Sequence, residues 1–241
     1  MAFKAFHVVP PDGAPAEQAR QRRRSLIGGD LQARRANGSP SELADPDVLD
    51  PVFRPSDFEV VRQWCQRDDG KPVVVEIGFQ LGEFAAAFCV AQPEVAYLGF
   101  EVRKHFCEET AKLLRSKGAE NARICLADAR PILAEVAAGG RLQEILVFFP
   151  DPWWKPRHIK KRLFSEHFVA DAHDWLRPGG RLLLKTDVEP YAALGEAVLR
   201  AHGGFAVERL ADPHAGLPWT LRERRCDLHG YPTWAVSGIR Q

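Results

Sequence analysis

The feature that most constrains the fold is a regular alternation, from residue 71 onward, of short apolar runs with helical stretches. Each run has the length of a buried strand, and the stretches between them repeat apolar residues at helical spacing. Such alternation with short connections is typical of a mostly parallel sheet with helices on both faces. Strands are expected at 73–77, 97–102, 123–126, 144–149, 181–186, 205–210 and 233–239, and helices at 83–91, 104–117, 131–138, 164–176 and 191–201. The sequence therefore predicts an α/β, Rossmann-like fold with a seven-stranded sheet.

The first 55 residues differ from the rest of the chain. They contain several prolines and glycines and an arginine run at 20–24, and they show few periodic apolar positions. We expect residues 1–55 to form a basic, partly flexible arm and residues 56–241 to form one domain, beginning with a helix at 57–66 capped by Ser56. An arm that contacts RNA and a tail without function both remain open.

Composition excludes several classes of protein. The net charge of +1 means that any binding of nucleic acid must come from local clusters of cations. The five cysteines are scattered without a C-x-x-C pair, which argues against a disulfide framework or a zinc site. No apolar stretch approaches the roughly 20 residues of a membrane span, and the first residues lack the order of a signal peptide. We therefore expect a soluble, cytoplasmic protein with no membrane contact and no metal.

Three acidic residues follow successive predicted strands. The first strand contains Glu76 and runs into a turn with Gly78 and Gly82; Glu101 comes 19 residues after Gly82, and Asp128 follows the third strand. An acid at the end of the second strand typically binds ribose hydroxyls. The G-x-x-x-G spacing does not match the G-x-G-x-x-G of dinucleotide sites. An acid-rimmed pocket suits S-adenosylmethionine, whose sulfonium is cationic; the alternative is that the acids only cap helices, above all Asp128.

A second cluster follows the apolar run at 145–148. The turn 149–153 reads Phe-Pro-Asp-Pro-Trp, and its prolines end the strand and stiffen the turn that carries Asp151 and Trp153. A carboxylate, an aromatic ring and a basic run together indicate a site that acts on a base while it holds a phosphate backbone. The alternative is a strand end with a solvated basic loop. The cations of the run are Lys155, Arg157, Lys160, Lys161 and Arg162.

From about residue 73 to the C-terminus the chain resembles the bacterial tRNA (guanine-N7-)-methyltransferase family. Residues 76–84 (Glu-Ile-Gly-Phe-Gln-Leu-Gly-Glu-Phe) resemble its first motif, and 149–153 with the basic run resemble its most specific one. Thr-Asp at 186–187, Thr-Leu-Arg-Glu at 220–223 and the turn at 230–234 resemble later segments of the family.

The resemblance implies a class I methyltransferase fold and transfer of a methyl group from S-adenosylmethionine to N7 of a guanine in tRNA, in the variable loop. It implies Asp151 as the catalytic residue and tRNA as the partner, with a monomer and a homodimer both open. The implied cofactor site consists of Glu76, Gly78, Gly82, Glu101, Asp128 and Asp151. The implied substrate contacts are Lys155, Arg157, Asp187, Thr220, Leu221, Arg222 and Glu223.

Three departures from the family keep other readings open. Gln80 stands where the family normally has glycine, Arg222 stands where an aromatic residue is common, and the usual N-terminal segment is not recognisable. One alternative is an RNA-binding protein on a decayed or retargeted methyltransferase fold. Another is a methyltransferase for a protein or a small molecule, against which the basic run argues. Thr220 and Glu223 have the spacing of a helix capping box, which is the alternative to substrate contact.

Overall fold

The structure, a computed structural model, describes residues 43, 45–153, 155–214 and 216–241. Most of the arm expected at 1–55 therefore lies outside the described residues. Its described end, at 45–54, packs against the domain, with Val48 and Leu49 buried. The boundary expected at residue 56 stays a prediction.

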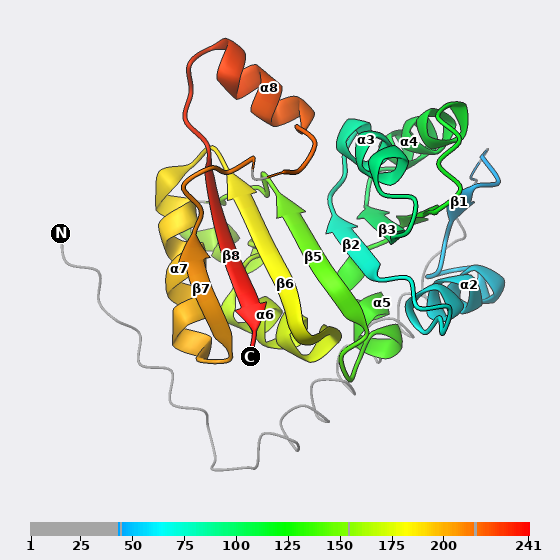
Figure 1. The fold of residues 1–241 in the computed structure, drawn as a ribbon, viewed down its shortest axis with the longest axis horizontal. Coiled ribbons are helices and arrows are strands. Elements are labelled where there is room, and N and C mark those ends of the chain that lie inside the picture. Colours follow the sequence, from blue (N-terminus) through cyan, green and yellow to red (C-terminus); the bar gives the residue numbers. More distant parts are fainter. Residues whose placement is uncertain (1–42, 44, 154, 215) are drawn as a thin grey trace.

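The described residues form a single sheet of eight strands in the order β1-β4-β3-β2-β5-β6-β8-β7 (Figure 1). Strands β1 to β6 pair in parallel, and β8 runs antiparallel to both of its neighbours. The α/β, mostly parallel prediction is confirmed, and β1 is an additional edge strand. The strands are β1 (Val48–Leu49), β2 (Val73–Ile77), β3 (Ala96–Glu101), β4 (Ala122–Leu126), β5 (Leu142–Phe148), β6 (Leu176–Thr186), β7 (Phe205–Arg209) and β8 (Trp234–Arg240).

Helices cover both faces of the sheet because its strands are apolar on both sides. The apolar sides of α2, α5, α6 and α7 pack on one face, and those of α3 and α4 pack on the other. The short 3-10 helix η1 was not expected from the sequence, and the polar helix α8 was indicated only by the capping-box spacing of Thr220 and Glu223. The helices are α2 (Pro55–Cys65), α3 (Glu83–Ala91), α4 (Lys104–Ser116), α5 (Ala129–Val136), η1 (Pro156–Lys161), α6 (Glu166–Trp175), α7 (Glu189–His202) and α8 (Leu221–Leu228).

Helix α2 begins earlier than its sequence predicted. Arg54 is the N-cap and Pro55 is the first helical residue, so the cap expected at Ser56 is wrong. Proline is favoured at the first helical position because its missing N–H has no partner there in any helix. Asp57 in the first turn accepts a hydrogen bond from the backbone N–H of Asp50 at 2.8 Å, which ties the helix to the preceding segment.

Two expectations on composition can be compared with the structure. All five cysteines are buried as free thiols, in agreement with the prediction of no disulfide framework. Within the described part of the chain, no helix has both the length and the apolar character needed to cross a bilayer.

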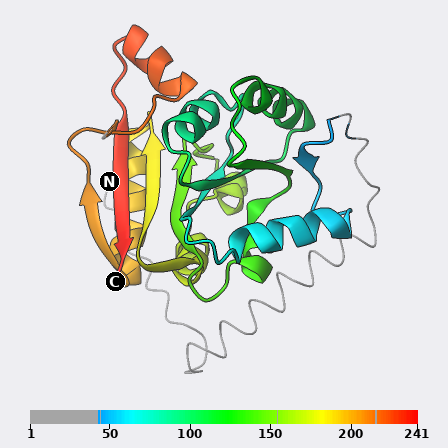
Figure 2. The ribbon, with the colours of Figure 1, turned by 45° about the vertical axis from the view of Figure 1, so that its right-hand side comes forward.

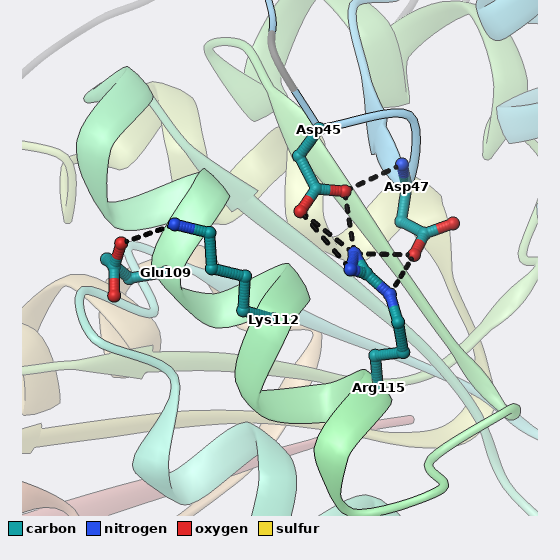
Figure 3. A network of polar contacts seen from close by, with 5 residues as sticks. All are labelled: Asp45, Asp47, Glu109, Lys112 and Arg115. Carbon is teal, nitrogen blue, oxygen red and sulfur yellow. Dashed lines mark hydrogen bonds and ion pairs between the residues drawn. The ribbon is translucent and has the colours of Figure 1, made fainter.

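An arginine on α4 holds the edge strand β1 in place (Figure 3). Arg115 Nη2 lies 2.8 Å from each carboxylate oxygen of Asp45, and its Nε lies 2.9 Å from Asp47 Oδ2. Asp45 is only 7% exposed, so its charge needs a partner. Lys112, one turn earlier, forms an exposed pair with Glu109 at 2.9 Å. Both cations lie on α4, but only Arg115 contacts the segment that leads into β1.

Replacing Arg115 with alanine is expected to release the segment 45–49. The free energy of unfolding should fall by about 1–2 kcal/mol, because the substitution leaves a buried carboxylate without its bidentate partner. Lys112→Ala is the control and should leave the free energy of unfolding almost unchanged, because exposed ion pairs contribute little. Urea unfolding measures the energies, and hydrogen exchange at the Val48 and Leu49 amides locates the change. Equal losses in the two variants would contradict the assignment.

Candidate active site

A cleft opens at the carboxyl ends of β2 and β5, where the strand order reverses. Open α/β sheets bind ligands at this point because the loops after the two strands lead to opposite faces. The cleft has two lobes that share Gly78, Gln80, Phe148 and Phe149. The larger lobe has a volume of about 240 Å³ and extends over β3 and β4; the smaller lobe lies between the first turn and α8.

The turn after β2 requires left-handed backbone at three positions. Gly78, Gln80 and Gly82 have φ angles of +87°, +52° and +68°. A Cβ on Gly82 would lie 2.2 Å from the Thr110 methyl group, so only glycine fits there. Gln80 adopts the same region with a side chain, at a cost of order 1 kcal/mol. Its carbonyl accepts a hydrogen bond from Thr110 Oγ1 at 3.2 Å, and the residue lines both lobes.

Glu76 is a buried carboxyl group at the base of the smaller lobe. Burial raises its pKa from 4.5 to about 7, and the hydrogen bond from Tyr97 Oη, at 2.5 Å from Oε2, opposes that shift. The group therefore changes its charge near neutral pH, at a position predicted for cofactor binding.

Only one of the two carboxylate oxygens of Glu101 accepts hydrogen bonds from described residues. Its Oε1 accepts the backbone N–H groups of Val102 and Arg103 at 2.8 and 3.1 Å. Its Oε2 accepts no hydrogen bond from any described residue. The side chain is 4% exposed and lines the larger lobe, so that oxygen is available to a donor in the cleft.

Asp128 has the capping role that the sequence left open. It is the N-cap of α5 and accepts the backbone N–H of Arg130 at 3.1 Å, while Arg130 Nη2 lies 2.6 Å from its other oxygen. Asp128 nevertheless lines the larger lobe beside Glu101, so capping and ligand contact are compatible here.

The Phe-Pro-Asp-Pro-Trp turn is strained on both sides of Asp151. Phe149 and Trp153 have φ angles of +50° and +41°, which are uncommon for bulky residues. The Phe149 N–H donates to the Lys185 carbonyl at 2.8 Å, which fixes the start of the turn. Asp151 is exposed and lines the larger lobe with Trp153. Strain of this kind is typical of functional sites.

The basic run folds back over this turn as η1. Lys161 Nζ lies 5.1 Å from the centre of the Trp153 ring, and Lys161 lines the larger lobe. Arg162 Nε donates to the Pro152 carbonyl at 2.8 Å, so Arg162 supports the turn. Lys155 and Arg157 are exposed beside it.

The opposite wall is the start of α8. Thr220, Leu221 and Arg222 line the smaller lobe. Thr220 and Glu223 form the capping box that the sequence allowed, with the Thr220 N–H 2.7 Å from Glu223 Oε2. Arg222 Nε lies 3.0 Å from Asp187 Oδ2, which joins the wall to the end of β6.

Glu223 points into the interior and away from the cleft. It is 1% exposed, and its Oε1 lies 2.8 Å from Lys185 Nζ and 3.0 Å from His214 Nδ1. Lys185 and His214 were not identified as site residues from the sequence. The available signal was Lys185 itself, a lysine at the end of an otherwise apolar strand.

This fold and cleft define a class I methyltransferase architecture, and the solved structures that resemble it agree. The 16S rRNA methyltransferase KamB superposes with a TM-score of 0.54 and 18% identity, over 78% of this chain and 94% of that one. A precorrin-6y C5,15-methyltransferase from Geobacter metallireducens gives 0.51 and 12%, over 84% and 94%. At these identities the likeness shows the fold alone.

Sequence comparison identifies the family. The family model described as "Putative methyltransferase" matches residues 70–234. A tRNA (guanine-N(7)-)-methyltransferase of Ralstonia nicotianae is 40% identical over 68% of this chain and 66% of its own length. One of Syntrophotalea carbinolica is 32% identical over 79% and 76%. The match spans 56% of another such relative, from Hydrogenovibrio crunogenus. The chain belongs to the bacterial tRNA (guanine-N(7)-)-methyltransferase family, as its motifs predicted.

Glu76→Gln is expected to change how stability depends on pH. The raised pKa of Glu76 means that its contribution is complete below pH 4.5 and is lost as the pH rises through about 7. The variant lacks that loss, so its stability relative to wild type should rise by about 2 kcal/mol between pH 5 and pH 8. Urea unfolding at both pH values measures this. Glu94→Gln, an exposed control, should follow wild type; if Glu76→Gln does so too, the assignment is refuted.

Proposed function

We propose that this chain is an enzyme that transfers a methyl group from S-adenosylmethionine to N7 of a guanine in tRNA. The observation that carries the proposal is the larger lobe, where Asp151, Glu101 and Lys161 face one cavity at the point of strand reversal. In this lobe Asp151 can contact the guanine base and Glu101 can contact the cofactor. Lys161 can contact the RNA backbone. Family membership supports the same reaction and substrate.

The residues present fit S-adenosylmethionine. Glu101 Oε2 is available to ribose hydroxyls, and Asp128 can accept from an adenine amino group. Phe100 and Ala127 supply apolar lining for the purine. Gly78 and Gly82 let the backbone of the first turn approach the ligand, and Glu76 lies at its base. When bound, the cofactor supplies a methyl group on a positively charged sulfur.

The chemistry requires placement more than proton removal. Guanine N7 has a lone pair and no proton to lose, so the chain must align N7 with the methyl group and exclude competing nucleophiles. Asp151 accepts a hydrogen bond from the guanine N1–H or amino group and balances the positive charge that develops on the ring. Asp187, paired with Arg222, holds the opposite rim of the pocket.

The RNA is held by its backbone. Lys155, Arg157 and Lys161 lie together on and beside η1 and are placed to contact phosphates next to the cleft. A folded tRNA is recognised mainly through its shape and backbone, with the target base turned out into the pocket.

The reaction is tested with Asp151→Asn. Protein, labelled S-adenosylmethionine and tRNA that lacks N7-methylguanosine are incubated, and the nucleosides are then identified. Wild type is expected to form N7-methylguanosine, and the variant should lose about 100-fold or more in kcat/KM because a charge at the reacting base is gone. Asp68→Asn, an exposed control, should match wild type. Full activity of Asp151→Asn would refute the catalytic role, and absence of methyl transfer by folded wild type would favour the decayed enzyme.

The phosphate contacts are tested by replacing Lys155, Arg157 and Lys161 together with glutamine. RNA affinity should fall. The slope of log K against log salt, which is negative, should become shallower by about 2–3, because roughly one unit of its magnitude is lost per phosphate contact. The control replaces three exposed cations near the amino ends of β4, β5 and β6, which gives the same change in net charge; they are Lys117, Arg141 and Arg177. Equal slopes in the two triple variants would mean that η1 is only a solvated surface.

A further inference from the structure

Helix α8 projects from the domain with little apolar packing. It stands above the carboxyl end of β6 and the amino end of β8 (Figure 1), and Figure 2 shows it clear of the helical layers. Its first residues and its N-cap line the smaller lobe of the cleft. Only Glu223 and Cys226 are buried among its eight residues. A helix at a protein surface ordinarily buries an apolar stripe against the core. The position of α8 therefore has to be fixed in another way.

A buried polar cluster anchors the helix. Glu223 joins Lys185 and His214, and the His214 ring stacks on Trp219 with centroids 4.0 Å apart and planes 9° from parallel. A buried ion pair adds little net stability, because desolvation offsets the attraction, but it favours one arrangement of its partners. The anchor sets the direction of α8, and the rest of the helix is left to face solvent.

The solvent-facing side carries cations and an exposed ring. Arg225 is exposed and makes no ion pair with any described residue; Arg224 is 54% exposed and reaches Glu83, across the smaller lobe, at 3.3 Å. Tyr231, in the turn after the helix, is 65% exposed and lies 5.9 Å from the His229 ring. Cations beside an accessible aromatic ring are the combination that binds single-stranded nucleic acid.

We propose that residues 224–231 form a second RNA-contact surface, the α8 surface, in which Arg224 and Arg225 bind phosphates and Tyr231 stacks on an unpaired base. This rests on the proposed function. The α8 surface and η1 flank the cleft on two sides, so one RNA segment can contact both while its base enters between them. The charge favours a polyanion over a second copy of the same chain, since a symmetric contact would bring the same arginines together.

The test uses the full chain with Arg225→Gln, Tyr231→Ala and the double variant, and an unmodified tRNA transcript. Kd is measured over a range of salt, with calorimetric binding of S-adenosylmethionine and Tm as checks on the fold. Arg225→Gln should reduce the magnitude of the salt slope by about one unit. Tyr231→Ala should weaken binding about fivefold or more with little change in slope, because stacking is not ionic. Arg177→Gln, at the amino end of β6 and away from the cleft, should leave the slope at the wild-type value.

Wild-type affinity and slope in both single variants, with tRNA still methylated, would overturn the α8 surface and leave the proposed function standing. A wild-type dimer in sedimentation that Tyr231→Ala dissociates, with RNA affinity unchanged, would assign the surface to self-association and overturn the proposal as well. If wild type neither binds nor methylates tRNA, both the proposed function and the α8 surface fail.

Discussion

The parallel pairing of β2 with β5 is the constraint on which the rest of the structure depends. Val74 to Ile77 register with Glu144 to Val147, so both strands end at the same level. The chain leaves β2 toward α3 on one face and leaves β5 toward η1 and α6, whose residues pack on the other. The two turns therefore separate above a shared floor, and the cleft forms between them. Every acid proposed to bind the cofactor lines the cleft at this end of the strands.

The residues that shape the cleft are locally unfavourable. Gln80, Phe149 and Trp153 are the non-glycine residues with positive φ in the described chain, and all three line the cleft. Each costs of order 1 kcal/mol and persists only where its surroundings dictate the conformation. The surroundings here are the buried strands β2 and β5 and hydrogen bonds such as that from Thr110 to Gln80. The sheet thus holds the cleft in a shape that the turns alone would not adopt.

The sequence predicted those parts of the structure that depend on periodicity and on strand ends. The strands from β2 to β8 and the acids Glu76, Glu101 and Asp128 follow from short apolar runs in a parallel arrangement. Strand β1 was missed because two residues show no period. The extent of α8 was missed because its residues are almost all polar, and only the capping-box spacing at 220–223 indicated its start. The Lys185–Glu223 pair joins positions 38 residues apart, and no local pattern records such a contact. The positive φ of Gln80 likewise follows from tertiary packing and not from its own preference.

Lys185 connects the two walls of the cleft through a single residue. Its carbonyl receives the Phe149 N–H at the start of the Asp151 turn, and its ammonium group lies 5.0 Å from the centre of the Phe148 ring and 2.8 Å from Glu223 at the base of α8. Lys185 is therefore the contact through which a displacement of one wall would reach the other. Such coupling between sites is reciprocal by thermodynamic necessity. Occupation of the larger lobe and capture of RNA at α8 would accordingly favour each other, through one lysine at the end of β6.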